Sequence, residues 1–95
     1  MARSIKVYPL NTANVAAAGV ATPQIPVNPS RISLFIQNTG ANGGYVRFGS
    51  PNQGQGFDVT VVPLGSFKWD QADTCPTEAL YFTGNTSWCV MEGNP

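Results

Sequence analysis

The side chains that could do chemistry in this sequence are few: five acids, two cysteines and no histidine. A glycosidase holds two carboxyl groups about 5 Å or about 6.5–9.5 Å apart across a sugar bond, and the sequence places no pair of acids in this way. A cysteine or serine nucleophile needs a general base beside it, and histidine, the usual base, is missing. We therefore expect no enzyme; the acids are Asp58, Asp70, Asp73, Glu78 and Glu92.

Two features could bind an ion or a cofactor. Asp70 and Asp73 could ligate a metal from one loop with Glu78 as a third ligand, or these acids simply cap and solvate a turn. The glycine-rich stretches 40–44 and 49–56 lack the Lys-Ser/Thr ending of a phosphate-binding loop and are not followed by a helical pattern. We expect turn acids and turn glycines, with no metal and no cofactor.

The two cysteines, Cys75 and Cys89, allow two interpretations. A disulfide between them would close a short loop, which is worth about 3 kcal/mol by loop entropy. Alternatively they are two reduced thiols, one in a loop and one packed in a strand. Synthesis in a cytosol favours the thiols, and the N-terminal residues show no long apolar run typical of a secretory signal.

Charge is scarce along the whole chain of 95 residues. Charged side chains make up 11% of the sequence, against about 25% in an average soluble domain, and the formal net charge is zero. No basic cluster exists to neutralise phosphates and no run is long enough to span a membrane, so we expect neither nucleic acid nor membrane as a partner. Asn, Gln, Ser and Thr can instead form hydrogen bonds at an interface without burying an ion. This composition predicts a surface covered by other subunits.

The elements that position these residues are short β-strands. Seven runs alternate apolar and polar side chains with period two, and Gly, Asn and Pro turns separate them. Strands at roughly 8–12 residue spacing without a helical pattern predict one small antiparallel β-sandwich, jelly-roll-like or immunoglobulin-like, of about seven to eight strands over residues 1–95. The expected strands are 4–8, 31–37, 45–48, 57–61, 67–70, 79–82 and 88–91.

One apolar stripe is expected to form the core. In the first strand the alternation places Ile5 and Val7 on one side and Tyr8 on the other, and Pro9 is expected to interrupt the strand. Tyr8, Phe35, Tyr45 and Tyr81 then lie at the outward phase of their strands. The expected core is Val7, Ile32, Leu34, Ile36, Val46, Phe48, Phe57, Val59, Val61, Phe67, Trp69, Leu80, Phe82, Trp88 and Val90.

Residues 9–30 differ from the rest of the chain in composition, with small uncharged side chains and several prolines. They are interpreted either as an irregular segment that skirts the domain or as an extended N-terminal arm that lies on a neighbouring subunit. The outward aromatic side chains could in turn form a contact face, or a second sheet could bury them. The candidate partner-binding residues are Asn11, Asn14, Val15, Val20, Gln24, Phe35, Tyr45 and Tyr81.

Four motifs give the chain a family likeness over about residues 29–92. They are Arg-x-x-Leu-x-Ile-Gln-Asn at 31–38, Val-x-Phe-Gly at 46–49, Pro-x-Gly at 63–65 and the Trp69-Asp70 pair before a closing hairpin. With these motifs the sequence resembles the small virion proteins of tailed bacteriophages, of the capsid decoration (cement) or head-fibre type.

The resemblance implies a structural protein that binds the major capsid protein and stabilises the shell. It also implies a homo-oligomer, with a trimer favoured, that is synthesised in the host cytoplasm and lies on the capsid surface of the virion. An alternative from a different class is a fibre or spike module that binds a host-surface glycan or receptor. That alternative predicts loop aromatic side chains next to Asn, Gln or Asp at one end of the sandwich. Tyr45 beside Asn42 and Trp88 beside Asn85 are the placements that the sequence offers.

Overall fold

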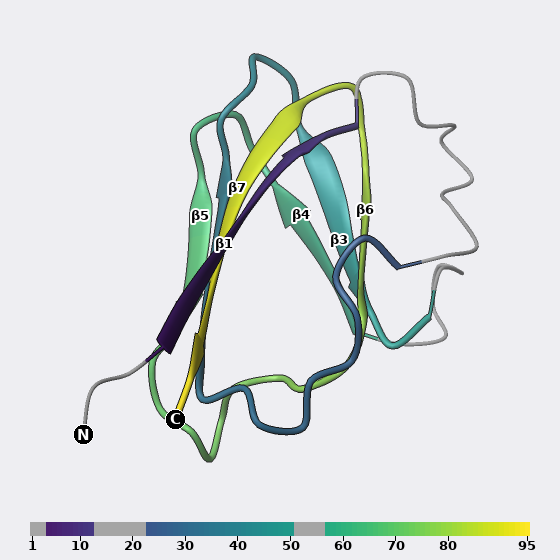
Figure 1. The fold of residues 1–95 in the computed structure, drawn as a ribbon. Coiled ribbons are helices and arrows are strands. Elements are labelled where there is room, and N and C mark those ends of the chain that lie inside the picture. Colours follow the sequence, from purple (N-terminus) through teal and green to yellow (C-terminus); the bar gives the residue numbers. More distant parts are fainter. Residues whose placement is uncertain (1–3, 13–22, 51–56) are drawn as a thin grey trace.

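The computed structural model describes residues 4–12, 23–50 and 57–95. They form seven strands in two antiparallel sheets that face each other (Figure 1). One sheet has four strands in the order β1-β7-β2-β5, and the other has three in the order β4-β3-β6. This architecture confirms the predicted all-β sandwich. The strands are β1 (Ser4–Asn11), β2 (Ser33–Asn38), β3 (Gly44–Phe48), β4 (Phe57–Val61), β5 (Ser66–Trp69), β6 (Leu80–Thr83) and β7 (Ser87–Asn94).

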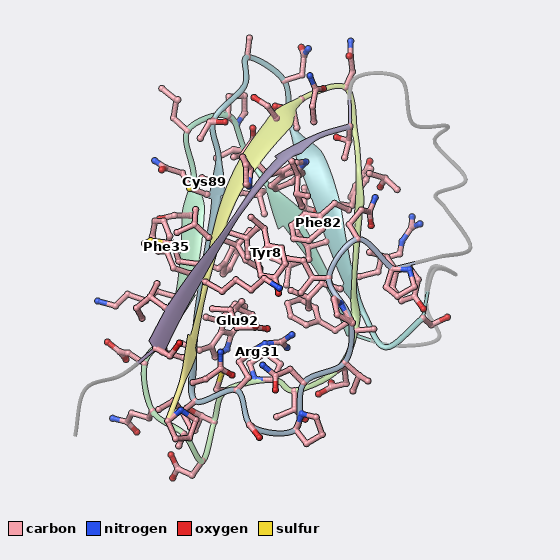
Figure 2. The ribbon with its side chains drawn as sticks, in the orientation of Figure 1. Tyr8, Arg31, Phe35, Phe82, Cys89 and Glu92 are labelled. Atoms are coloured by element: carbon pink, nitrogen blue, oxygen red, sulfur yellow. The ribbon has the colours of Figure 1, made fainter. Side chains whose placement is uncertain are left out.

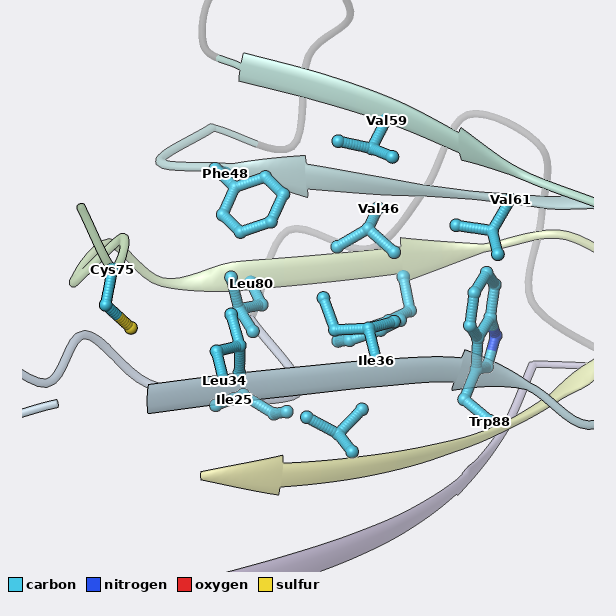
Figure 3. Packing of buried hydrophobic residues seen from close by; sticks show 12 residues of the cluster. Ile25, Leu34, Ile36, Val46, Phe48, Val59, Val61, Cys75, Leu80 and Trp88 are labelled. Atoms are coloured by element: carbon cyan, nitrogen blue, oxygen red, sulfur yellow. The ribbon is translucent and has the colours of Figure 1, made fainter. Parts of the chain in front are cut away.

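The core lies between the two sheets and is built from alternate positions of their strands (Figure 3). The strand alternation predicted most of it, because one face of each sheet must be apolar for two sheets to pack. Phe82 and Trp88 meet edge to face with ring centroids 5.2 Å apart. The buried apolar residues are Ile25, Leu34, Ile36, Val46, Phe48, Val59, Val61, Cys75, Leu80, Phe82, Trp88 and Val90.

Strand β1 differs from the prediction in two respects. Pro9 does not end it, since β1 pairs with β7 along all eight residues; an edge strand tolerates a proline because one side of it has no ladder to complete. The prediction of which β1 side chains face the core is also wrong. Tyr8 and Leu10 pack against the core, whereas Ile5 and Val7 are each 53% exposed. The register with β7 explains the phase, because Tyr8 lies opposite the buried Val90.

Strand β5 also departs in part from the predicted core. Its two aromatic rings stack on one side of the strand, as expected, with centroids 6.2 Å apart. Trp69 packs against the core and meets Phe48, but Phe67 is 39% exposed because β5 is the edge of its sheet. The side chain of Phe57 lies outside the described residues.

Of the two interpretations of residues 9–30, the segment around Ile25 agrees with an irregular segment that skirts the domain and not with an arm, whereas residues 9–11 agree with neither. Residues 9–11 belong to β1, and the segment around Ile25 closes the free edge of β6 instead of reaching away. Ile25 is fully buried and exchanges two backbone hydrogen bonds with Leu80, of 3.3 and 2.9 Å. The Gln24 amide continues this pairing: it donates to the Phe82 carbonyl and accepts from the Phe82 N–H. An unpaired edge invites aggregation, and here the same chain covers it. Residues 13–22 lie outside the described residues.

Candidate functional site

The outer face of the four-stranded sheet carries a row of apolar side chains. The register places Val7, Met91 and Phe35 side by side on three neighbouring strands, with Lys68 at the end of the row. Val7 is 53% exposed and Met91 38% exposed, while Phe35 is half-buried. Figure 2 shows Phe35 and Cys89 on the side of the sheet away from Phe82. Contiguous exposed apolar surface of this kind is typical of an interaction site.

A groove of about 220 Å³ crosses one end of this face. It forms where Gly93 and Ser33, two small residues, lie side by side in the middle strands, and its walls include Ile5, Phe35 and Trp69. Small-molecule sites usually enclose about 300–1,000 Å³. The groove is therefore better matched to one or two apolar side chains of a protein than to a whole cofactor.

The rim of the groove holds one cation and one anion that pair with each other. Lys68 lies 3.3 Å from Asp70, and both side chains are more than half exposed. Because the two charges compensate, the groove presents no net charge to an occupant. Asp70 is thus part of a surface ion pair and of the groove. Across the described ranges 4–12, 23–50 and 57–95, no group of three His, Cys, Asp or Glu side chains could hold a metal ion.

A buried ion pair on the inner side of the same sheet connects distant loops (Figure 2). The Arg31 guanidinium donates to Glu92 at 2.8 Å, and both residues are buried. Its other nitrogens donate to backbone carbonyls of Pro26, Pro76 and Glu78, at 3.2, 2.9 and 3.0 Å. Arg31 therefore fastens the 26–31 segment and the 71–79 loop to β7. The geometry is that of a structural clamp, since the donors of Arg31 are directed at groups of the chain itself.

The protonation of Glu92 follows from this clamp. Burial alone would raise the pKa of the Glu92 carboxyl, but the hydrogen bond and positive charge of Arg31, with further bonds including one from the Tyr8 hydroxyl, outweigh it. The net result is a pKa lowered from the ordinary 4.5, so Glu92 is ionised in the folded chain.

We expect the stability of the fold to decrease in acid for this reason. A carboxyl whose pKa is lower in the folded than in the unfolded chain stabilises the fold above its ordinary pKa, and that contribution is lost as the pH falls through the folded value. Urea unfolding measured from about pH 7 to about pH 3 should show a decline below the ordinary value of 4.5. The decline should be smaller in Glu92→Gln, and Asp70→Asn should keep the wild-type slope. Equal slopes in Glu92→Gln and wild type would contradict this assignment.

The structure does not gather the predicted partner-binding residues into one site. Phe35 lies on the outer face of the four-stranded sheet, whereas Tyr45, 48% exposed, and the half-buried Tyr81 lie on the opposite face of the sandwich. Asn11 is exposed at the end of β1. Gln24 is a correction, because its amide bonds to β6 within the chain and is not free for a partner. The remaining candidates, Asn14, Val15 and Val20, lie outside the described residues.

Sequence reasoning did not name Ile5, Val7 or Met91 among the candidate partner-binding residues. The signal was present in β1 as alternation, but alternation alone does not say which of the two sets faces inward. Trp88 is only 2% exposed, which confirms its place in the predicted core, and it donates its indole N–H to the Thr12 hydroxyl at 3.1 Å. It therefore cannot stack on a sugar, and the pairing of Trp88 with Asn85 is removed from the glycan-binding alternative.

The two cysteines are free thiols in the structure. Cys75 is buried in the core cluster, and burial raises the pKa of its thiol above the ordinary value. Cys89 is half-buried on β7. Of the two alternatives that the sequence left open, the structure therefore has the two reduced thiols, one in a loop and one in a strand.

Within the part of the chain that the structure describes, no helix is long and apolar enough to cross a membrane.

No protein-family model matches the sequence, and no curated protein matches it either. Among solved structures, a functionally unknown conserved protein from Bacillus anthracis str. Ames, solved as a mutant, is similar over 97% of this chain, with 16% identity and a TM-score of 0.48. This chain spans 22% of the length of that protein. PirA is similar over 97% of this chain and 84% of its own, with 14% identity and a TM-score of 0.41. Likenesses this distant carry no argument about function.

Proposed function

We propose that this chain is a structural virion protein that decorates a capsid by binding the major capsid protein. The observation that carries the proposal is the apolar outer face of the four-stranded sheet, around Val7, Phe35 and Met91, on a chain with 11% charged residues. A freely diffusing domain keeps such a face small or covers it with charge. The face therefore suits a protein that functions while docked on another surface.

The shell as partner is supported by the resemblance in the 31–38, 46–49 and 63–65 motifs to small tailed-phage virion proteins. A protein that binds the assembled shell and not its free subunits stabilises the assembly by mass action, and it needs no catalytic group to do so. Many weak contacts suffice if several copies act together, because linked contacts add avidity. A homo-oligomer on the capsid surface, with three copies favoured, fits this requirement.

Adding a charge to the apolar face tests the proposal. We expect Val7→Lys to raise the Kd for empty shells of the major capsid protein, measured by co-sedimentation, by about tenfold, because an apolar contact worth about 1.4 kcal/mol would be replaced by a buried charge. Thr60→Lys is the matched control, since Thr60 is an exposed strand residue on the opposite sheet. Equal occupancy of Val7→Lys and wild type would exclude this face, and no binding of wild type to any shell would exclude the function.

A further inference from the structure

A strained turn projects apolar side chains into solvent between β4 and β5. Leu64 is 73% exposed and Val62 is 64% exposed, with Pro63 between them. Leu64 has φ of +63°, a left-handed conformation that side chains with a Cβ disfavour. Backbone strain that persists in a folded protein is held by its surroundings and often marks a functional position.

Backbone hydrogen bonds hold this turn in place. The Leu64 N–H donates to the Asn38 carbonyl at 2.9 Å, and the Asn38 N–H donates to the Gly65 carbonyl at 3.0 Å. A third bond, from the Gly65 N–H to the Val62 carbonyl, closes the turn at 2.9 Å. Residues 62–64 thus form a rigid apolar projection, which we call the knob.

The knob and the groove lie at opposite ends of the four-stranded sheet. The knob immediately precedes β5, whereas the groove includes Trp69 and Asp70 at the other end of that strand. Leu64 lies five positions before Trp69, or roughly 17 Å at 3.3–3.4 Å per residue of extended chain. A rigid knob cannot reach the groove of its own chain. Both the knob and the groove are therefore left for contacts with a second copy.

We propose that the knob of one copy inserts into the groove of the next, which makes head-to-tail contacts between identical chains. The inference rests on the proposed homo-oligomer and specifies its interface. The two surfaces match in charge: the knob has none, and the groove has only the mutually compensated Lys68 and Asp70 at its rim. They also match in size, since about 220 Å³ accommodates one or two aliphatic side chains and is smaller than a metabolite site.

Contacts of this type are heterologous, so they either close into a ring or continue as a filament. A ring of three copies is the form that the proposed function favours. One knob is a small contact, and closure strengthens it because all contacts of a ring form together. The insertion covers Phe35 and Met91, which line the groove, and leaves Val7 and Cys89 of the same sheet face for the shell.

Complementary variants test the interface directly. Leu64→Gly removes the most exposed apolar side chain of the knob and leaves the groove intact. Glycine adopts the left-handed conformation without strain, so the fold should be retained. Ser33→Phe fills the groove from the outer face and leaves the knob intact. We expect the wild-type chain to sediment as a multiple of its 10.1 kDa at concentrations up to about 1 mM, which detects even millimolar contacts. Each variant alone should sediment as a monomer.

A mixture of the two variants provides the decisive measurement. The knob of Ser33→Phe can enter the groove of Leu64→Gly, so the mixture should form a complex of two chains and nothing larger. Val27→Ser, at another exposed valine, should keep the wild-type mass, and thermal unfolding should verify that every variant is folded. A monomeric wild type, an unchanged assembly in Leu64→Gly, or a mixture that stays monomeric would each overturn the inference. None of these masses depends on shell binding, so failure of the capsid proposal would be recognised separately in the co-sedimentation assay.

Discussion

Replacing Arg31 with methionine is expected to lower the free energy of unfolding by about 3–5 kcal/mol, because breaking a buried ion pair leaves the other charge without compensation. Arg31 bonds to Glu92 and to three backbone carbonyls. In Arg31→Met the Glu92 carboxylate stays buried without its cation, and the three part-buried carbonyls lose their donor. A domain of this size has about 5–15 kcal/mol of stability in total, so much of it would be lost. Urea unfolding at neutral pH measures the change.

Two further variants distinguish the loss of the buried bonds of Arg31 from the loss of a positive charge alone. Lys68→Met removes a cation from the exposed pair with Asp70 and should cost less than about 1 kcal/mol. The double variant Arg31→Met with Glu92→Leu should recover part of the loss, because it removes the isolated charge but leaves the three carbonyls unbonded. If Arg31→Met were no more harmful than Lys68→Met, the clamp would not contribute to stability.

The sequence predicted the central strands well because they are buried on one face and bounded by turns. Leu34 and Ile36 in β2, and Val46 and Phe48 in β3, alternate with side chains of different character, and the inward set is unambiguous there. Edge strands are harder, since neither face is required to be fully buried. In β1 both sets contain apolar residues, and only the pairing with β7 decides that Tyr8 and Leu10 face the core.

The clamp and the groove could not be derived from local pattern. Arg31 is one of five scattered cations in the sequence, and its ion-pair partner is 61 residues away. Three of its acceptors are backbone carbonyls, which carry no sequence signal. The groove depends on Gly93 and Ser33 becoming neighbours across two strands, and this follows from register, which a single sequence does not specify.

Substitution of Asn38 by leucine is expected to lower the free energy of unfolding by about 2–4 kcal/mol, because each buried polar group left without a partner costs about 1–3 kcal/mol. The Asn38 side chain is fully buried and donates to the carbonyls of Asn42 and Val61, at 2.8 and 3.1 Å. It accepts from the Gly40 N–H at 3.0 Å and from the Thr86 hydroxyl at 2.6 Å. Leucine has a similar size but could replace none of these bonds.

Asn42→Leu is the matched control, since Asn42 is an exposed asparagine in the following loop with one side-chain bond to the Asn85 carbonyl. Its change should stay within about 0.5 kcal/mol, as is usual for surface substitutions. A cost in Asn38→Leu no larger than that in Asn42→Leu would show that the buried network is not a determinant of the fold.

Asn38 also links this network to the knob, because its backbone groups bond to Leu64 and Gly65. Asn38→Leu removes the side-chain bonds of this network. It should therefore raise the hydrogen-exchange rate of the Leu64 amide by more than that of the Phe35 amide, at the centre of β2. Knob insertion requires a turn that is already ordered, since ordering it on contact would reduce the affinity. Asn38→Leu should for that reason weaken assembly even under conditions where the variant remains folded. If exchange at Leu64 became faster and the mass in solution stayed the same, assembly would not need a rigid turn.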